Sequence, residues 1–346
     1  MPSLFNEKEE CDDPNNSDVN DNPNQTQNND SNILNDNSVN YEILLKNAKK
    51  GNLIDQGNFG EVFEAIDTSI NKKYAVKVYY VCFEDYSNKS QIDILKHMNI
   101  IKQLNFPSVL KCYDYSINGF DNESRQTILT EYCSFRSLRE VLDSKPHELD
   151  NTSIHIILYG IAAGLSYLHK HNILHKDLKP SNILIDENLY PKISDVGYST
   201  HFHSLKSMAK IKEISHYTAP EVLISNKYTK ESEVFAFALI AYELITGKDP
   251  FGNVSQFNLM EKIVNNSRPY LDDSIPEVYI DLITKCWSQN PEDRLTFEEI
   301  CKELKRSFEF LERKEDFEQY TKIIDDFCEI NKPFDQEIRL DDDLFN

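Results

Sequence analysis

Residues 173–184 carry side chains that can act together on one substrate. Asp177, Lys179 and Asn182 place a carboxylate, an ammonium group and an amide at short, fixed steps, and a second carboxylate follows at Asp195. Phosphoryl transfer to a hydroxyl group needs such a set. One acid deprotonates the hydroxyl, a lysine neutralises the moving phosphoryl group, and an amide and a second acid hold magnesium ions. The residue types and their spacing therefore point to phosphoryl transfer.

A glycine-containing segment at residues 54–62 precedes Lys77 by a short interval. Gly57 and Gly60 would let backbone N–H groups approach anionic oxygens without a side chain intervening. Either feature alone is weak, because such a segment fits any hairpin and a single lysine in a strand usually carries surface charge. Together, upstream of Asp177, they indicate a nucleotide-binding site.

These motifs resemble the signatures of the eukaryotic protein kinase family, H-R-D-L-x-x-x-N and D-F-G. The matching segments are residues 175–182, residues 195–197 and the Ala-Pro-Glu sequence at residues 219–221, and the likeness extends over residues 45–310. It implies an α+β, bilobal protein kinase fold, in which a small β-rich N-lobe with one helix precedes a larger, mainly helical C-lobe. It also implies that the chain uses ATP and Mg²⁺ to phosphorylate a protein.

The resemblance assigns a role to each residue of the motifs. It makes Asp177 the catalytic base and Lys179 the residue that neutralises the phosphate, and it makes Asn182 and Asp195 the magnesium ligands. The residues that it places around the nucleotide are Ile54, Gly57, Gly60, Val62, Ala75, Lys77, Thr130, Glu131, Cys133 and Leu184.

Two further groups of residues have family counterparts. Thr130 matches the gatekeeper at the back of the adenine pocket, and Glu131 to Cys133 would supply backbone hydrogen bonds to adenine. The resemblance also implies a buried ion pair between Glu221 and Arg294 that is structural and not catalytic.

Several positions depart from the family pattern. Asp55 replaces the first glycine, where an acid should weaken nucleotide binding. His97 falls where the family has a helix glutamate that pairs with the nucleotide-binding lysine. A neutral ring there could accept a hydrogen bond from that lysine, whereas a protonated ring would repel it. Val196 is a smaller apolar plug than the phenylalanine of D-F-G, and Lys176 lacks the guanidinium fork of the usual arginine. Glu233 replaces an aspartate and Ala238 replaces a glycine beneath the catalytic loop, and each change should perturb that scaffold.

The sequence leaves two hypotheses about activity open. The retained motif residues favour an active serine/threonine-protein kinase. Lys179 is typical of that type, while residues 286–294 resemble the tyrosine-kinase-like branch. Asp55, His97 and Val196 motivate the alternative, a pseudokinase that binds ATP or acts as a scaffold. An ATP-dependent enzyme acting on a small molecule is disfavoured, because the activation segment at residues 197–219 resembles machinery for protein substrates. The candidate phosphorylation sites in that segment are Ser199, Thr200, Ser204 and Ser207.

The elements that must position these residues follow from the apolar patterns. The expected strands are 53–62, 74–79, 109–115 and 127–131, and the expected helices are 91–104, 152–171, 231–246, 279–287 and 297–310. The expected domains are a disordered Asn/Asp-rich tail (1–40), a kinase domain (41–312, with N-lobe 41–131, hinge 132–137 and C-lobe 138–312) and an acidic C-terminal extension (313–346). The extension carries irregularly spaced Phe and Ile residues. It is either a docked helix with a frayed end or a tail that binds a partner.

Composition limits the partners and the compartment. The net charge of −21 over 346 residues disfavours nucleic acid and anionic membranes as partners. The seven cysteines show no paired C-x-x-C spacing, so we expect reduced thiols. No apolar run approaches the ~20 residues of a membrane span, and the N-terminus lacks the pattern of a signal peptide. We therefore expect a cytoplasmic protein whose partner is a protein substrate with a serine or threonine hydroxyl. The oligomeric state stays open.

Overall fold

The computed structural model describes residues 48–57, 60–117, 125–133, 137–144, 149–196 and 214–331. The predicted N-terminal tail, the four candidate phosphorylation sites and residues 332–346 lie outside these ranges. Six cysteines lie within them, and all six have free thiols. In the same part of the chain, no helix is both long and apolar enough to cross a membrane.

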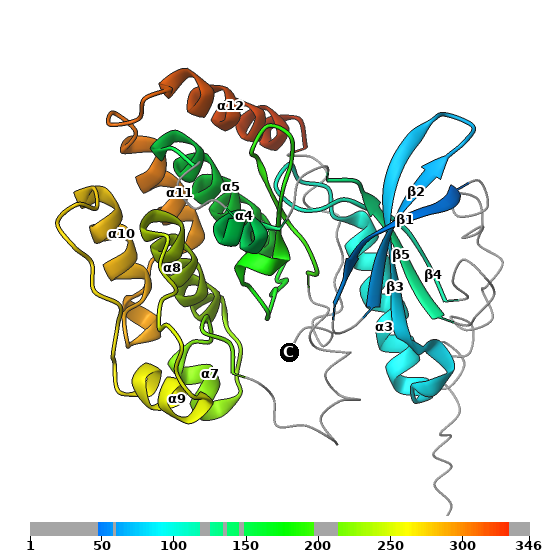
Figure 1. Cartoon of the computed structure of the whole chain (residues 1–346), viewed down its shortest axis with the longest axis horizontal. Helices are drawn as coiled ribbons and strands as arrows, with labels where there is room; N and C mark the ends of the chain where they lie inside the picture. The colour runs from blue at the N-terminus through cyan, green and yellow to red at the C-terminus, as the bar shows by residue number, and fades with distance from the viewer. Residues whose placement is uncertain are drawn as a thin grey trace, which may run out of the picture. The chain divides into compact units, whose positions relative to one another are not determined.

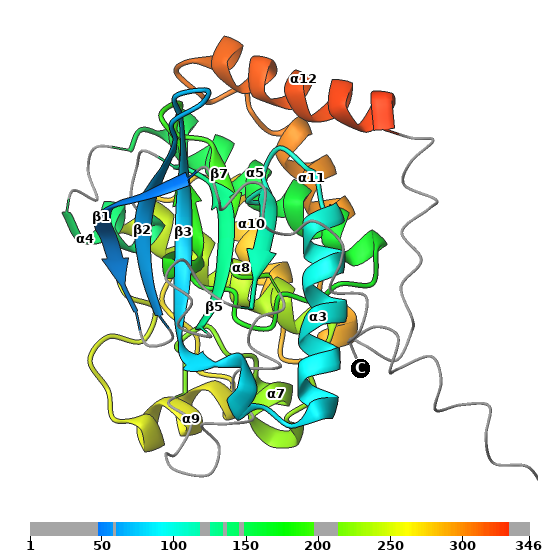
Figure 2. The same ribbon diagram turned by 90° about the vertical axis from the view of Figure 1, so that its right-hand side faces the viewer.

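The N-lobe is an antiparallel five-stranded sheet in the order β1-β2-β3-β5-β4 (Figures 1 and 2). Its strands are β1 (Ala48–Gln56), β2 (Gly60–Asp67), β3 (Lys72–Cys82), β4 (Cys112–Ser116) and β5 (Arg125–Glu131). Lys77 on β3 lies opposite Val62 of β2 and Ile128 of β5. Val76 and Leu129 are fully buried in a small core on one face of the sheet. Because side chains alternate along a strand, Lys77 points to the other face.

The prediction of a single strand at 53–62 is wrong, because two strands occupy this range. Gly57 N–H donates to Gly60 O at 2.9 Å, and Gln56 pairs with Glu61, so β1 and β2 form a hairpin. The apolar residues on either side of the glycines belong to two antiparallel strands. The prediction followed their β propensity and ignored the Gly-Asn turn signal between them.

Helix α3 (Asn88–Gln103) is the one α-helix in the described part of the N-lobe. It begins three residues before the predicted start, because the Ser87 side chain accepts a hydrogen bond from Ser90 N–H and caps the helix. Its buried face carries Ile94, His97 and Met98, together with Ile100 and Ile101. The predicted helical spacing is therefore confirmed, and His97 lies on the inner face.

The C-lobe is mainly helical, as predicted. Its helices are α4 (Leu138–Ser144), α5 (Asn151–Lys170), α7 (Pro220–Ser225), α8 (Lys230–Thr246), α9 (Gln256–Val264), α10 (Glu277–Cys286) and α11 (Phe297–Arg306), with 3₁₀ turns at η2 (Pro180–Asn182) and η3 (Pro291–Asp293). A short hairpin, β6 (Ile183–Ile185) and β7 (Pro191–Ile193), lies beside α5. Helix α8 is buried along most of its length, which matches its nearly all-apolar sequence.

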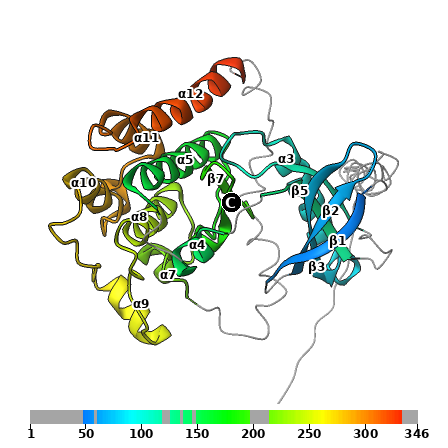
Figure 3. The ribbon, with the colours of Figure 1, turned by 45° about the horizontal axis from the view of Figure 1, so that its top comes forward.

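The end of α11 and the segment after it differ from the prediction. The expected helix 297–310 stops at Arg306, and Ser307 leaves the helical conformation. A new helix, α12 (Lys314–Asn331), then packs along α5 (Figures 1 and 3). Its buried residues Phe317, Tyr320 and Ile324 follow a helical spacing. For residues 314–331 the structure therefore supports the docked helix, and the spacing of its apolar residues is regular and not irregular.

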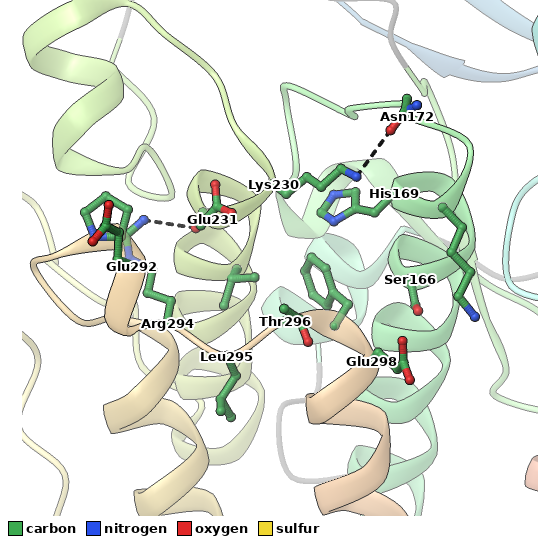
Figure 4. A pocket seen from close by; sticks show the side chains of 14 residues that line it. Ser166, His169, Asn172, Lys230, Glu231, Glu292, Arg294, Leu295, Thr296 and Glu298 are labelled. Carbon is green, nitrogen blue, oxygen red and sulfur yellow. Dashed lines mark hydrogen bonds between the residues drawn. The ribbon is translucent and has the colours of Figure 1, made fainter. Parts of the chain in front are cut away.

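The predicted ion pair between Glu221 and Arg294 is present in the C-lobe. Arg294 donates from Nη1 and Nη2 to the two carboxylate oxygens of Glu221 at 2.6 and 2.9 Å. Arg294 Nη1 also donates to Glu231 O at 2.9 Å, on the wall of a cavity of about 450 Å³ (Figure 4). Burial and the nearby Arg294 lower the pKa of Arg268 to about 10. Glu221 therefore compensates positive charge in a crowded, buried region.

Glu221→Gln should lower the free energy of unfolding by about 3 kcal/mol, because Arg294 then keeps a buried charge without its counterion. Urea unfolding of both proteins at neutral pH measures the change. Glu292→Gln is the matched control, since Glu292 is exposed near Arg294 and should have little effect. Equal stability of the two variants would contradict the structural role.

Candidate active site

A cavity of about 600 Å³ lies between the N-lobe sheet and the β6–β7 side of the C-lobe. Eight of the predicted nucleotide-binding residues line it: Ile54, Val62, Ala75, Lys77, Thr130, Glu131, Cys133 and Leu184. Asp195 lines it as well. Burial raises the pKa of the Cys133 thiol to about 12, so this wall presents a neutral thiol at neutral pH. The structure thus brings most of the predicted nucleotide site together around one cavity.

Gly57 and Gly60 lie in the β1–β2 hairpin and are not among the residues that line the cavity. A Cβ at position 60 would collide with the backbone oxygen of Val78 on β3, whereas a Cβ at position 57 would meet open space. Gly60 is therefore needed for the close approach of β2 to β3. That constraint is separate from the contact with phosphate that the sequence predicted.

The three predicted residues of the catalytic loop contact one another. Lys179 Nζ lies 2.7 Å from Asp177 Oδ2. Asn182 Nδ2 donates to the backbone oxygen of Asp177 at 2.7 Å and to its Oδ2 at 3.0 Å. The carboxylate of Asp177 is thus held in one orientation by a cation and an amide.

Buried side chains fix the position of the catalytic loop. Glu233 on α8 accepts a hydrogen bond from Lys176 N–H at 2.7 Å, and its other oxygen bonds His169 Nε2 at 2.7 Å. Lys176 has a φ of 66°, a left-handed conformation that a non-glycine residue adopts only when its surroundings impose it. The longer glutamate therefore still reaches the loop, and the expected disturbance of the scaffold is not seen.

His175 connects the catalytic loop to the segment that carries Asp195. Its Nδ1 accepts a hydrogen bond from Asp177 N–H at 3.2 Å, so its Nε2 is the donor to Ser194 O at 2.8 Å. Ser194 N–H in turn donates to Asn182 O at 2.9 Å. The two candidate metal-binding residues, Asn182 and Asp195, are therefore fixed in one hydrogen-bonded unit.

Lys77 forms an ion pair with Asp195 across the cavity. Lys77 Nζ lies 2.6 and 2.7 Å from the two carboxylate oxygens. Burial alone would raise the pKa of Asp195, but the adjacent Lys77 cation outweighs it and holds the pKa below its usual range. The predicted nucleotide-binding lysine and a candidate magnesium ligand thus stabilise each other.

His97 makes a different contact from the one expected. Its Nε2 lies 3.2 Å from Val196 O, and because a carbonyl oxygen only accepts, the ring donates this hydrogen bond. His97 is 2% exposed and Val196 is 5% exposed. Helix α3 is therefore tied to the residue after Asp195, and the smaller Val196 plug is still packed in the core.

Sequence reasoning missed the back wall of the cavity. Tyr79 and Ile128 line it, and each lies two positions from a predicted site residue, Lys77 or Thr130, on the same strand. The alternation of side chains along a strand could have identified both. Ile101, one helical turn beyond His97, lines it as well.

Comparisons with known proteins identify the family of this chain. The protein kinase domain family model matches residues 48–304, which contain every residue of the candidate site. A probable serine/threonine-protein kinase of Dictyostelium discoideum is 31% identical over 267 residues, covering 74% of this chain and 19% of that protein. A putative serine/threonine-protein kinase/receptor of Acanthamoeba polyphaga mimivirus is 29% identical, covering 77% of this chain and 16% of that protein. The serine/threonine-protein kinase TNNI3K of Mus musculus is 31% identical, covering 76% and 32%.

The chain spans less than a third of the length of each of these relatives. The family model, in contrast, matches most of the chain and includes both lobes. This chain belongs to the protein kinase domain family.

Proposed function

We propose that this chain is a serine/threonine-protein kinase that transfers the γ-phosphoryl group of ATP to a hydroxyl group of a protein. The convergence of Asp177, Lys179 and Asn182 beside a cavity lined by Lys77 and Asp195 carries the proposal. The relatives described as serine/threonine-protein kinases support the choice of substrate hydroxyl.

The residues around the cavity fit ATP and Mg²⁺. The cavity volume of about 600 Å³ lies within the range of small-molecule pockets. Asp195 and Asn182 offer a carboxylate and an amide oxygen, and Mg²⁺ commonly takes one or two protein oxygens and completes its shell with phosphates and water. Because Asn182 Nδ2 donates to Asp177, its Oδ1 is the atom that a cation would use. When bound, ATP and Mg²⁺ supply the transferable phosphoryl group and positive charge beside it.

The protein residues would then act as follows. Asp177 orients the substrate hydroxyl and accepts its proton, while Lys179 places a positive charge next to the transferred group. Lys77, which is paired with Asp195 in this structure, would hold the α- and β-phosphates of a bound nucleotide. The Asp195 oxygens would then be available to a metal ion.

The substitutions that suggested a pseudokinase are accommodated in the fold. Asp55 lines the cavity but is exposed, and its side chain accepts a hydrogen bond from Gln56 N–H at 2.8 Å. Val196 is packed in the core, and His97 donates to its carbonyl oxygen. These contacts support an active kinase over a scaffold that has lost its catalytic geometry.

The remaining assignments belong to the same proposal. We place the catalytic unit at residues 41–312, with a tail at 1–40 and an extension at 313–346. A protein with a serine or threonine hydroxyl is the partner. The free thiols of Cys112 and Cys286 suit the reducing cytoplasm, which is where we place the protein.

Asp177→Asn should reduce phosphate transfer from radiolabelled ATP to a generic protein substrate by at least about 100-fold, because the amide cannot accept the hydroxyl proton. Affinity for ADP and the unfolding midpoint should change little. Asp281→Asn, an exposed aspartate on α10, is the matched control and should keep wild-type activity. Wild-type activity as low as that of Asp177→Asn would favour the pseudokinase.

Lys77→Met should lower the free energy of unfolding by an amount that depends on pH. In the wild type the lowered pKa of Asp195 contributes stability that is present at neutral pH and is lost as pH falls through that pKa. In the variant, only the smaller effects of His175 and Lys179 oppose burial, so the pKa of Asp195 is higher than in the wild type. The variant should therefore be clearly less stable than the wild type at pH 7. The difference between their free energies of unfolding should narrow between about pH 5 and pH 3. Urea unfolding at three pH values measures it, and a constant gap would refute the ion pair's role.

A further inference from the structure

Helix α12 lies outside the residues that the kinase family model matches, yet its inner face is part of the core. Phe317 and Tyr320 are 1% exposed and Ile324 is 3% exposed. The helix lies along α5 (Figures 1 and 3). Helix α12 is therefore packed as part of the folded domain.

Two aromatic side chains of α12 contact segments that lead to the candidate active site. The Tyr320 ring lies 4.3 Å, centroid to centroid, from the ring of Tyr190, the residue before β7. The Phe327 ring packs edge-on against Phe106, between α3 and β4, at 5.5 Å. Phe106 is also stacked on Tyr167 of α5 at 4.7 Å. Helix α12 therefore touches both the start of β7 and the connection that follows α3.

These two segments are joined to each other by backbone hydrogen bonds. Ile193 N–H on β7 donates to Ser108 O at 2.8 Å, and Leu110 N–H donates back to Ile193 O at 2.9 Å. Asp195 follows Ile193 by two residues. A displacement of either segment would thus be transmitted through two hydrogen bonds to Ile193, the last residue of β7, which lies two residues before Asp195.

A glycine on α5 permits the close packing of α12 and β7. A Cβ at Gly160 would collide with both the Tyr320 hydroxyl oxygen and the Pro191 ring of β7. Tyr320 and β7 therefore occupy the same small depression on α5. Docking of α12 and placement of β7 depend on one another at this point.

We infer that α12 is a positioning element for Asp195, and that Tyr320 and Phe327 hold β7 and the α3–β4 connection together from outside the family domain. This inference builds on the proposed role of Asp195 as a metal-binding residue. It gives the C-terminal extension a function within the catalytic unit.

Hydrogen exchange of the full chain without nucleotide tests the packing directly. Phe327→Ala should accelerate amide exchange about tenfold in peptides that contain Leu110 or Ile193, while peptides from α8 keep their wild-type rates. Phe327 is only partly buried, so this variant should fold, and Phe327→Leu is a milder second variant with a smaller effect. The matched controls are Lys322→Ala, exposed on the same helix, and Leu304→Ala, buried on α11.

The control variants separate positioning from general stability. Lys322→Ala should change nothing, and Leu304→Ala should lower the unfolding midpoint without selective exchange at Leu110 and Ile193. Exchange that is unchanged in both Phe327 variants, or that rises equally in α8, would overturn the inference.

A second measurement connects the packing to the metal. Calorimetric titration with ADP at increasing Mg²⁺ should show that Phe327→Ala needs at least about threefold more Mg²⁺ for half-maximal enhancement, while binding of ADP without Mg²⁺ is unchanged. An unchanged Mg²⁺ requirement would refute a positioning role. If the wild-type protein shows no Mg²⁺-dependent binding, the proposed kinase function fails, and the exchange experiment still decides whether α12 holds β7.

Discussion

The ion pair between Lys77 and Asp195 joins two segments that are 118 residues apart. It depends on the sheet that carries Lys77 and on the segment that carries Asp195. Lys77 is fixed because β3 is hydrogen-bonded to strands on both sides. Asp195 has a φ of 56°, in the left-handed region, which costs a non-glycine residue about 1 kcal/mol or more. The surrounding network of Ser194 and His175 holds it there. The sheet and the catalytic segment must therefore both be in place before the pair can form.

The substitution of histidine at position 97 changes how α3 takes part in this arrangement. A glutamate at this position would add a second carboxylate near Lys77, whereas His97 donates a hydrogen bond to Val196 O. A hydrogen bond of this kind contributes about 1 kcal/mol net. Helix α3 is thus connected by a hydrogen bond to the backbone of Val196, the residue after Asp195.

The parts of the site that the sequence predicted are those in which function depends on residue type within a short segment. Asp177, Lys179 and Asn182 lie within six residues, so their contacts follow from one loop. The bilobal kinase fold was predicted for the same reason, because the motifs are specific and in the expected order. The partner of Glu233 could not be predicted, since whether its longer side chain still reaches Lys176 N–H depends on how α8 packs under the loop. The hairpin between β1 and β2 was missed because propensity outweighed a short turn signal.

In the sequence of helix α12, the acidic residues obscure the regular spacing of the apolar residues. Phe317, Tyr320, Ile324 and Phe327 are separated by three, four and three residues, which places them on one face of a helix. The acidic residues between them fall on the exposed faces, and Asp325 pairs with Lys305 of α11 at 2.6 Å. Such an exposed pair adds little stability, so the apolar stripe is what holds the helix to α5. Because that stripe extends as far as Phe106 and Tyr190, the same apolar burial that stabilises α12 also constrains the two segments next to the candidate active site.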